Sequence, residues 1–132
     1  MFIVKRLHKG QDLKKEIENI VKENDLKAAV VLSAVGCVSH LEIRLAGGKD
    51  YLKTDGDYEI VSLNGTLSKD GVHLHIAVSD RNGKTIGGHL CYNCLINTTC
   101  ELVIESVDGY LFSREFDENT GYRELKIMEE EK

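Results

Sequence analysis

The stretch Val72–Val78 reads VHLHIAV, and its return, Ile86–Cys91, reads IGGHLC after a turn-rich segment. Successive side chains of a β-strand point to opposite faces of the sheet. In the first stretch the even-numbered residues are large aliphatics, and two histidines and an alanine take the other positions. The pattern therefore predicts two paired strands with one apolar face and one imidazole-bearing face.

The turn between the two stretches decides which residues face each other. Residues 81–83, Arg-Asn-Gly, suit a three-residue loop closed by Gly83 in the left-handed region. Three cross-strand pairs follow from that loop: Asp80 with Lys84, His75 with His89, and His73 with Cys91. A two-residue turn, Asn82-Gly83, would instead pair His89 with Ile76. We favour the three-residue loop because it keeps every large aliphatic side chain on one side.

The preceding strand extends this division to a third strand. Residues 58–67 read as a strand, and Ser68–Gly71 turns it back into the first histidine stretch. The expected apolar positions on this strand are Val61, Leu63 and Leu67. On the return strand that carries His89, Ile86, Leu90 and Tyr92 are expected on the same apolar face. The expected neighbours of His73 and His75 on the polar face are Ser62, Asn64 and Thr66. We therefore expect one polar face that is coherent over three strands.

The rest of the chain indicates an α+β fold. Leu13, Ile17, Ile20 and Val21 have the spacing of an amphipathic helix, and Asp12 is a suitable N-cap. The other expected strands are 2–7, 28–34, 37–45, 98–107, 110–116 and 122–127. We therefore expect a mostly antiparallel sheet of seven or eight strands with one main helix.

Length, composition and charge limit the possible functions. A chain of 132 residues, 42% hydrophobic and 30% charged, suits one soluble domain over residues 1–132, with 128–132 as a frayed tail. Its net charge of −5 disfavours broad attachment to nucleic acid or anionic lipid. We expect a cytoplasmic protein because no signal-peptide pattern or membrane-spanning run is found, and so we expect its four cysteines to be reduced.

The histidines are the residues best suited to carry chemistry. Two imidazoles two positions apart on a strand converge on one face, and imidazole nitrogen suits zinc. The predicted metal ligands are His73, His75 and His89, with Cys91 as a candidate fourth and His40 as a residue that folding could add. The competing interpretation is a polar face whose histidines hydrogen-bond Ser62, Asn64 and Thr66.

Other kinds of site have weaker support. The sequence has no Gly-x-Ser-x-Gly nucleophile motif and no phosphate-binding glycine loop. Cys91-x-x-Cys94 lacks the second pair of a zinc ribbon, and Cys37 and Cys100 are expected to be small buried residues. Gly87-Gly88 is better explained by a close approach of two backbones, or by a bulge, beside His89.

Several segments together resemble a stand-alone prokaryotic PPC domain, the plant-and-prokaryote domain that plants fuse to AT-hooks. They are YEIVSLNGTL (58–67), HLHI (73–76), GKTIGGHL (83–90) and SREFDENTGYREL (113–125). The resemblance covers about residues 4–127. It implies a homotrimer, and it implies that His73, His75 and His89 match histidines that hold a divalent metal such as zinc in prokaryotic members.

The resemblance also implies a DNA-associated or regulatory role. An AT-hook binds the A·T minor groove through a basic Arg-Gly-Arg-Pro core, and this chain has no proline and no Arg-Gly-Arg. Direct DNA binding would need a basic patch assembled from several subunits, or a partner that carries the hook. The alternative function is a small zinc-dependent hydrolase or lyase that uses a metal-bound water at the His73/His75/His89 face.

Overall fold

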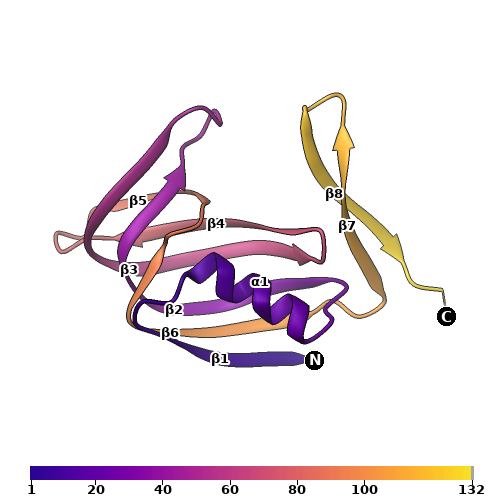
Figure 1. Ribbon diagram of the computed structural model, residues 1–132, viewed down its shortest axis with the longest axis horizontal. Helices are drawn as coiled ribbons and strands as arrows, with labels where there is room; N and C mark the ends of the chain where they lie inside the picture. The colour runs from indigo at the N-terminus through magenta and orange to yellow at the C-terminus, as the bar shows by residue number, and fades with distance from the viewer. Residues whose placement is uncertain (132) are drawn as a thin grey trace.

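The computed structural model describes residues 1–131, which form one α-helix and eight β-strands (Figure 1). In chain order the elements are β1 (Phe2–His8), α1 (Leu13–Glu23), β2 (Ala29–Arg44), β3 (Tyr51–Ser68), β4 (Gly71–Ser79), β5 (Thr85–Leu90), β6 (Leu95–Ser106), β7 (Tyr110–Asp117) and β8 (Tyr122–Glu129). The expected α+β class, with a largely antiparallel sheet and one helix, is confirmed.

Six strands form the main sheet in the order β1-β6-β2-β3-β4-β5, and each pairing is antiparallel. The sheet also closes on itself at one end, because β5 pairs with β2 as well as with β4. Gly88 makes this closure possible: a Cβ there would lie 2.6 Å from the Arg44 carbonyl oxygen. The expected close approach at Gly87-Gly88 is therefore confirmed.

Helix α1 lies over one face of the sheet (Figure 1). Its N-cap is Asp12, whose Oδ1 accepts a hydrogen bond from the Lys15 N–H at 3.1 Å. The four apolar residues of its stripe, Leu13, Ile17, Ile20 and Val21, are buried in the core. This burial of one apolar stripe explains why the sequence forms a helix at this place.

The last two strands form a separate sheet, the β7–β8 hairpin, which stands away from the main sheet in Figure 1. Two backbone groups attach it to the body of the molecule. The Phe112 N–H donates to the Lys27 carbonyl at 2.9 Å, and the Arg114 N–H donates to an Asp70 carboxylate oxygen at 3.1 Å.

Several expected strand limits were wrong. The segments 28–34 and 37–45 form the single strand β2, which continues through Gly36 with irregular register, and β3 starts at Tyr51 rather than at Tyr58. Met128 and Glu129, which were expected in a frayed tail, pair with β7 as part of β8, while residue 132 lies outside the described residues.

Two expected core positions were also wrong. A β-bulge between Ile60 and Ser62 turns Val61 outward, where it is 58% exposed, and Ile60 is buried instead. Tyr92 follows the end of β5 and is 49% exposed, and its hydroxyl donates to the Glu18 carboxylate at 2.7 Å. Both errors have one cause: the strand alternation is interrupted at these positions.

Among residues 1–131, no helix is both long enough and apolar enough to span a membrane. The four cysteines are free thiols, and Cys94 and Cys100 are buried while Cys37 and Cys91 are partly exposed.

Candidate metal centre

The turn between β4 and β5 has the predicted three-residue loop. Gly83 has a φ of 78°, its N–H donates to the Asp80 carbonyl at 3.0 Å, and the Asp80 N–H donates to the Lys84 carbonyl at 2.9 Å. The resulting register pairs His75 with His89. The alternative pairing of His89 with Ile76 is thereby excluded.

His73, His75 and His89 come together on the polar face of the sheet and are called the triad below. Their ring centroids are 5.0 Å apart for His73 and His75, 5.3 Å for His73 and His89, and 5.9 Å for His75 and His89. One ring nitrogen from each histidine lies within 4.8 Å of the other two. Nitrogens that share a zinc ion at Zn–N distances of about 2.0–2.1 Å are roughly 3.4 Å apart in a tetrahedral site. Small side-chain rotations are thus enough to bring the triad onto one ion.

The polar neighbours on β3 take their predicted places. Asn64 lies opposite His75, and Thr66 lies opposite His73. The Thr66 hydroxyl accepts a hydrogen bond from the Arg114 guanidinium at 3.0 Å. One of the three residues that were expected to hydrogen-bond the histidines is therefore bonded to an arginine.

The surroundings of His73 and His89 lower the pKa of both imidazoles and so favour their neutral form. Partial burial is the largest cause that lowers the pKa of His89, to about 4, and the nearby Arg44 cation lowers it further. Partial burial also lowers the pKa of His73, with Arg114 as the next cause. The Nδ1 atom of His89 is buried and has no hydrogen-bond partner among the described residues. A neutral ring with an unused buried nitrogen has the chemistry of a metal ligand, so the triad fits a divalent ion.

The other candidate ligands do not join the triad. Cys91 does not pair with His73; its N–H donates to the Glu42 carbonyl, and its thiol contacts the His89 carbonyl oxygen at 3.7 Å. His40 is held elsewhere: Nδ1 lies 2.6 Å from Asp55 and Nε2 lies 2.8 Å from Glu42. These two hydrogen bonds raise the pKa of His40.

Cys94 forms a local contact rather than a metal site. Its buried thiol donates to the Glu42 carbonyl oxygen at 3.2 Å and lies 3.3 Å from the Glu42 N–H. Burial is the largest cause that raises the pKa of this thiol to about 11, so the group is protonated and unreactive at neutral pH.

A cavity of about 340 Å³ opens beside His73 and His89 and is called the triad cavity below. Its walls include Arg44, Arg114 and Tyr122, none of which the sequence indicated as site residues. Arg44 is positioned by the β2–β5 pairing and Arg114 by the hairpin. Both arrangements join parts of the chain that are distant in sequence. The alternation of residues within one strand therefore could not predict that either arginine lies at the cavity.

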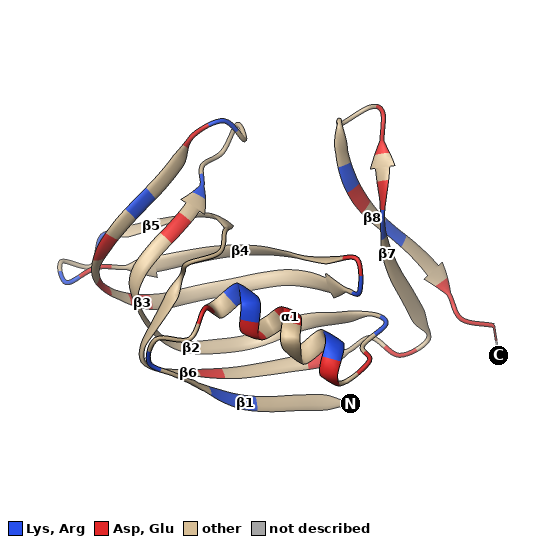
Figure 2. Cartoon of the chain, viewed as in Figure 1, with Lys and Arg blue, Asp and Glu red and all other residues tan. Residues whose placement is uncertain are grey.

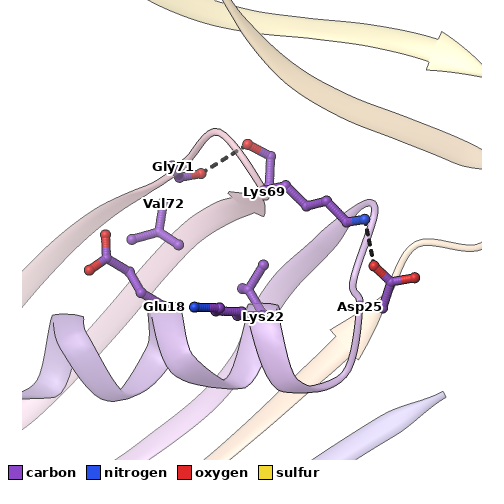
Figure 3. A pocket seen from close by; sticks show the side chains of 8 residues that line it. Glu18, Lys22, Asp25, Lys69, Gly71 and Val72 are labelled. Carbon is purple, nitrogen blue, oxygen red and sulfur yellow. Dashed lines mark hydrogen bonds and ion pairs between the residues drawn. The ribbon is translucent and has the colours of Figure 1, made fainter.

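A second cavity, of about 470 Å³, lies between α1 and the β3–β4 turn (Figure 3). Lys69 on its rim pairs with Asp25, and this contact lowers the pKa of the Asp25 carboxyl. The buried Ser68 hydroxyl donates to the Gly71 carbonyl at 3.0 Å. The side chains of Ser68, Lys69 and Asp25 thus already have partners within the chain, and no histidine lines the cavity.

The sequence matches the family model of the Plants and Prokaryotes Conserved (PCC) domain over residues 2–108. Among curated proteins, it is 50% identical over 123 residues to the bifunctional protein GlmU of Synechococcus sp. strain JA-3-3Ab. That match covers 92% of this chain and 20% of the relative, so the chain spans about a fifth of that protein's length.

Solved structures have the same fold over nearly the whole chain. A hypothetical protein from Salmonella cholerae-suis is 38% identical, with a TM-score of 0.94 over 98% of this chain and 94% of the other. A metal-containing protein from Archaeoglobus fulgidus is 30% identical, with a TM-score of 0.77 over 96% and 93%. A candidate DNA-binding protein from Bacteroides thetaiotaomicron is 22% identical, with a TM-score of 0.83 over 95% and 91%, and this likeness shows the fold alone.

Proposed function

This chain belongs to the Plants and Prokaryotes Conserved (PCC) domain family, and we propose that it is a metal-binding, trimer-forming module of that family. The triad is the proposed site, and zinc is the proposed ion because three imidazole ligands suit zinc well. One observation carries the metal proposal: three ring nitrogens lie within 4.8 Å of one another. The buried, unpartnered Nδ1 of His89 and the metal-containing relative of Archaeoglobus fulgidus support it.

Metal analysis of the purified protein tests this proposal. After equilibration with a mixture of divalent ions and removal of the excess, the wild-type protein should retain one zinc ion per chain. His75→Ala and His89→Ala should lose the ion. His40→Ala is the matched control and should retain it, because His40 is held by Asp55 and Glu42 outside the triad. A metal-free wild-type protein, or retention by both triad variants, would overturn the proposal.

The outer face of the β1–β6–β2 region supports assembly with further copies of the chain. Phe2, Val4 and Val35 are 61%, 73% and 59% exposed. Val4 of β1 and Ser33 of β2 both pair with the partly buried Val103 of β6, so Val4 and Val35 lie on one face of the sheet, on the two strands that flank β6. Exposed apolar side chains that cluster on one face are typical of a protein interface.

Solution mass tests the trimer. Light scattering should give three times the mass of one chain for the wild-type protein. The double variant Val4→Lys/Val35→Lys should shift the mass toward one chain. Ile127→Lys is the control, because Ile127 is similarly exposed, at 58%, but lies on the separate hairpin. A monomeric wild-type protein, or a trimer that the double variant leaves unchanged, contradicts the assembly.

For the DNA-associated role, we propose that contact with DNA is made through a partner. Basic and acidic residues are interspersed over the helix and strands rather than gathered into one basic stripe (Figure 2). With a net charge of −5, the chain lacks the electrostatic attraction that supports direct binding. Mobility-shift assays at low ionic strength should therefore show no retardation of duplex DNA by the protein alone. Retardation that weakens steadily with salt would establish direct binding instead.

The alternative function is a small zinc-dependent hydrolase or lyase. The observation that favours it is the triad cavity, which gives a small molecule room beside His73 and His89. Screening of ester, phosphoester and amide substrates with zinc-loaded protein tests this function. Turnover that His89→Ala abolishes would establish the enzyme, and absence of turnover would favour the binding module.

A further inference from the structure

The triad cavity has two arginines in its walls. Arg44 lies opposite a triad histidine, and Arg114 hydrogen-bonds the neighbour of another. Arg44 ends β2 directly opposite His89 of β5. Its guanidinium carbon lies 5.8 Å from the centre of the Tyr122 ring, which also lines the cavity. The cross-strand pair and the aromatic ring together place the Arg44 cation at the wall.

Arg114 reaches the other side of the triad from the hairpin. One nitrogen of its guanidinium donates to the Thr66 hydroxyl at 3.0 Å, and Thr66 is the cross-strand neighbour of His73. Partial burial lowers the pKa of Arg114, but a guanidinium stays charged at any physiological pH. The only side-chain partner that the described residues give this cation is a neutral hydroxyl.

Neither guanidinium forms an ion pair. Among residues 1–131 no carboxylate lies within 4.0 Å of the side-chain nitrogens of Arg44 or Arg114. Asp70 and Glu124 also line the cavity, but an Asp70 oxygen is used by the Arg114 backbone N–H. Partly buried cations that form no ion pair favour an anion that completes their hydrogen bonds.

The charge of the whole cavity agrees with this preference. Arg123 also lines it and donates a hydrogen bond to the Arg114 carbonyl at 3.1 Å. Three arginines therefore stand against two carboxylates in a chain whose net charge is −5. A divalent ion on the triad would make the cavity more positive still.

We propose that the triad cavity binds a small oxyanion, a carboxylate or phosphate group of a small metabolite, between Arg44 and Arg114. A cavity of about 340 Å³ is large enough for a small organic molecule. The proposal extends the proposed metal function, because the anion would lie beside the triad. The arginine contacts themselves do not require the ion, so the two proposals can be tested separately.

The test is calorimetric titration of the full chain with inorganic phosphate and with malonate, each with zinc-loaded and with chelator-treated protein. The wild-type protein should bind at least one of the two anions saturably, and the stronger binder identifies the group. Arg44→Gln and Arg114→Gln should each weaken that binding at least tenfold. Arg81→Gln is the control, because Arg81 pairs with Asp57 at the β4–β5 turn and should leave the affinity unchanged.

Arg114→Lys controls for loss of structure, because it keeps the charge and should recover part of the affinity. Absence of saturable binding of either anion to zinc-loaded and zinc-free wild-type protein overturns the oxyanion site. The oxyanion site is also overturned if Arg44→Gln and Arg114→Gln both bind the anion as strongly as Arg81→Gln does. Metal analysis of the same samples separates the two proposals: zinc retention without anion binding refutes the oxyanion site alone. Anion binding by a protein that retains no zinc refutes the metal function alone.

Discussion

His75 and His89 lie directly opposite each other on β4 and β5, with ring centroids 5.9 Å apart. The pair depends on a three-residue loop that ends in the left-handed Gly83. A change of one residue in loop length would move His89 to the other face of the sheet. The site is therefore sensitive to backbone features that contain no metal ligand.

Closure of the sheet should be more sensitive to substitution than the turn. A methyl group added by Gly88→Ala would lie 2.6 Å from the Arg44 carbonyl oxygen and force β5 away from β2. We expect a loss of about 1–3 kcal/mol in the free energy of unfolding, together with weaker zinc binding. Urea denaturation and metal analysis measure the two effects.

Gly83→Ala is the comparison variant for Gly88→Ala. No atom lies within 4 Å of a Cβ at this position, so the cost comes only from the positive φ and should be about 1 kcal/mol. Equal losses of stability and metal in the two variants would argue against backbone closure as the constraint at Gly88.

The core beneath the triad should determine stability independently of metal. Leu74 lies between His73 and His75 in sequence but faces the interior, where it is 1% exposed. Leu74→Ala should lower the free energy of unfolding of the metal-free protein by about 2–5 kcal/mol, because it leaves a cavity. Ile127→Ala, at a position that is 58% exposed, should change it by less than about 0.5 kcal/mol. Denaturant melts in chelator compare the two.

Asp12 should stabilise both the start of α1 and the loop after β5. Its Oδ1 accepts from the Lys15 N–H at 3.1 Å, and its Oδ2 accepts from the Asn93 N–H at 2.6 Å. Asp12→Ala removes both acceptors and should cost about 1–2 kcal/mol. Asp12→Asn keeps only one acceptor oxygen, so we expect a smaller loss from it. Thermal melts rank the two variants, and an equal loss would show that the acceptor oxygen which asparagine keeps contributes nothing.

His40 should give the protein a pH-dependent contribution to stability. Hydrogen bonds that His40 donates to the carboxylates of Asp55, the largest cause, and of Glu42 raise its folded-state pKa above the ordinary value of 6.5. The folded state therefore holds the proton more tightly than the unfolded state. The resulting stabilisation is fully present below pH 6.5 and is lost as the pH rises through the folded-state pKa.

NMR titration measures the pKa of His40, and urea melts below pH 6.5 and above the folded-state pKa measure the change in stability. His40→Asn should remove the decline in stability that this group causes, and Asp55→Asn should lower the pKa of His40. A His40 resonance that titrates at or below 6.5 would refute the assignment.

The sequence predicted the triad because the residues that determine it lie close together in the chain. Gly83 sets the loop, and the alternation of residues 72–78 and 86–90 sets the faces, so His73, His75 and His89 follow by counting. The helix followed from its apolar spacing and the Asp12 cap. Counting failed where the regular backbone was interrupted, at the bulge beside Val61 and beyond the end of β5 at Tyr92.

The arginine walls could not be predicted in this way. Arg44 alternates with apolar residues like any exposed strand residue, and only the β2–β5 pairing places it opposite His89. Arg114 lies on a hairpin of mixed charge whose position depends on contacts with Thr66, Asp70 and Lys27. Such contacts between distant segments leave no periodic trace in the sequence.

The β7–β8 hairpin lies beyond residues 2–108, the part of the chain that the PCC family model matches. All three histidines lie inside that part, while Arg114 and Tyr122 lie outside it. In the two proposals, the ion contacts only the segment that the family model matches, while the anion contacts Arg44 inside that segment and Arg114 outside it. Exchanging the β7–β8 hairpin should therefore change the proposed anion selectivity and leave the three imidazoles in place.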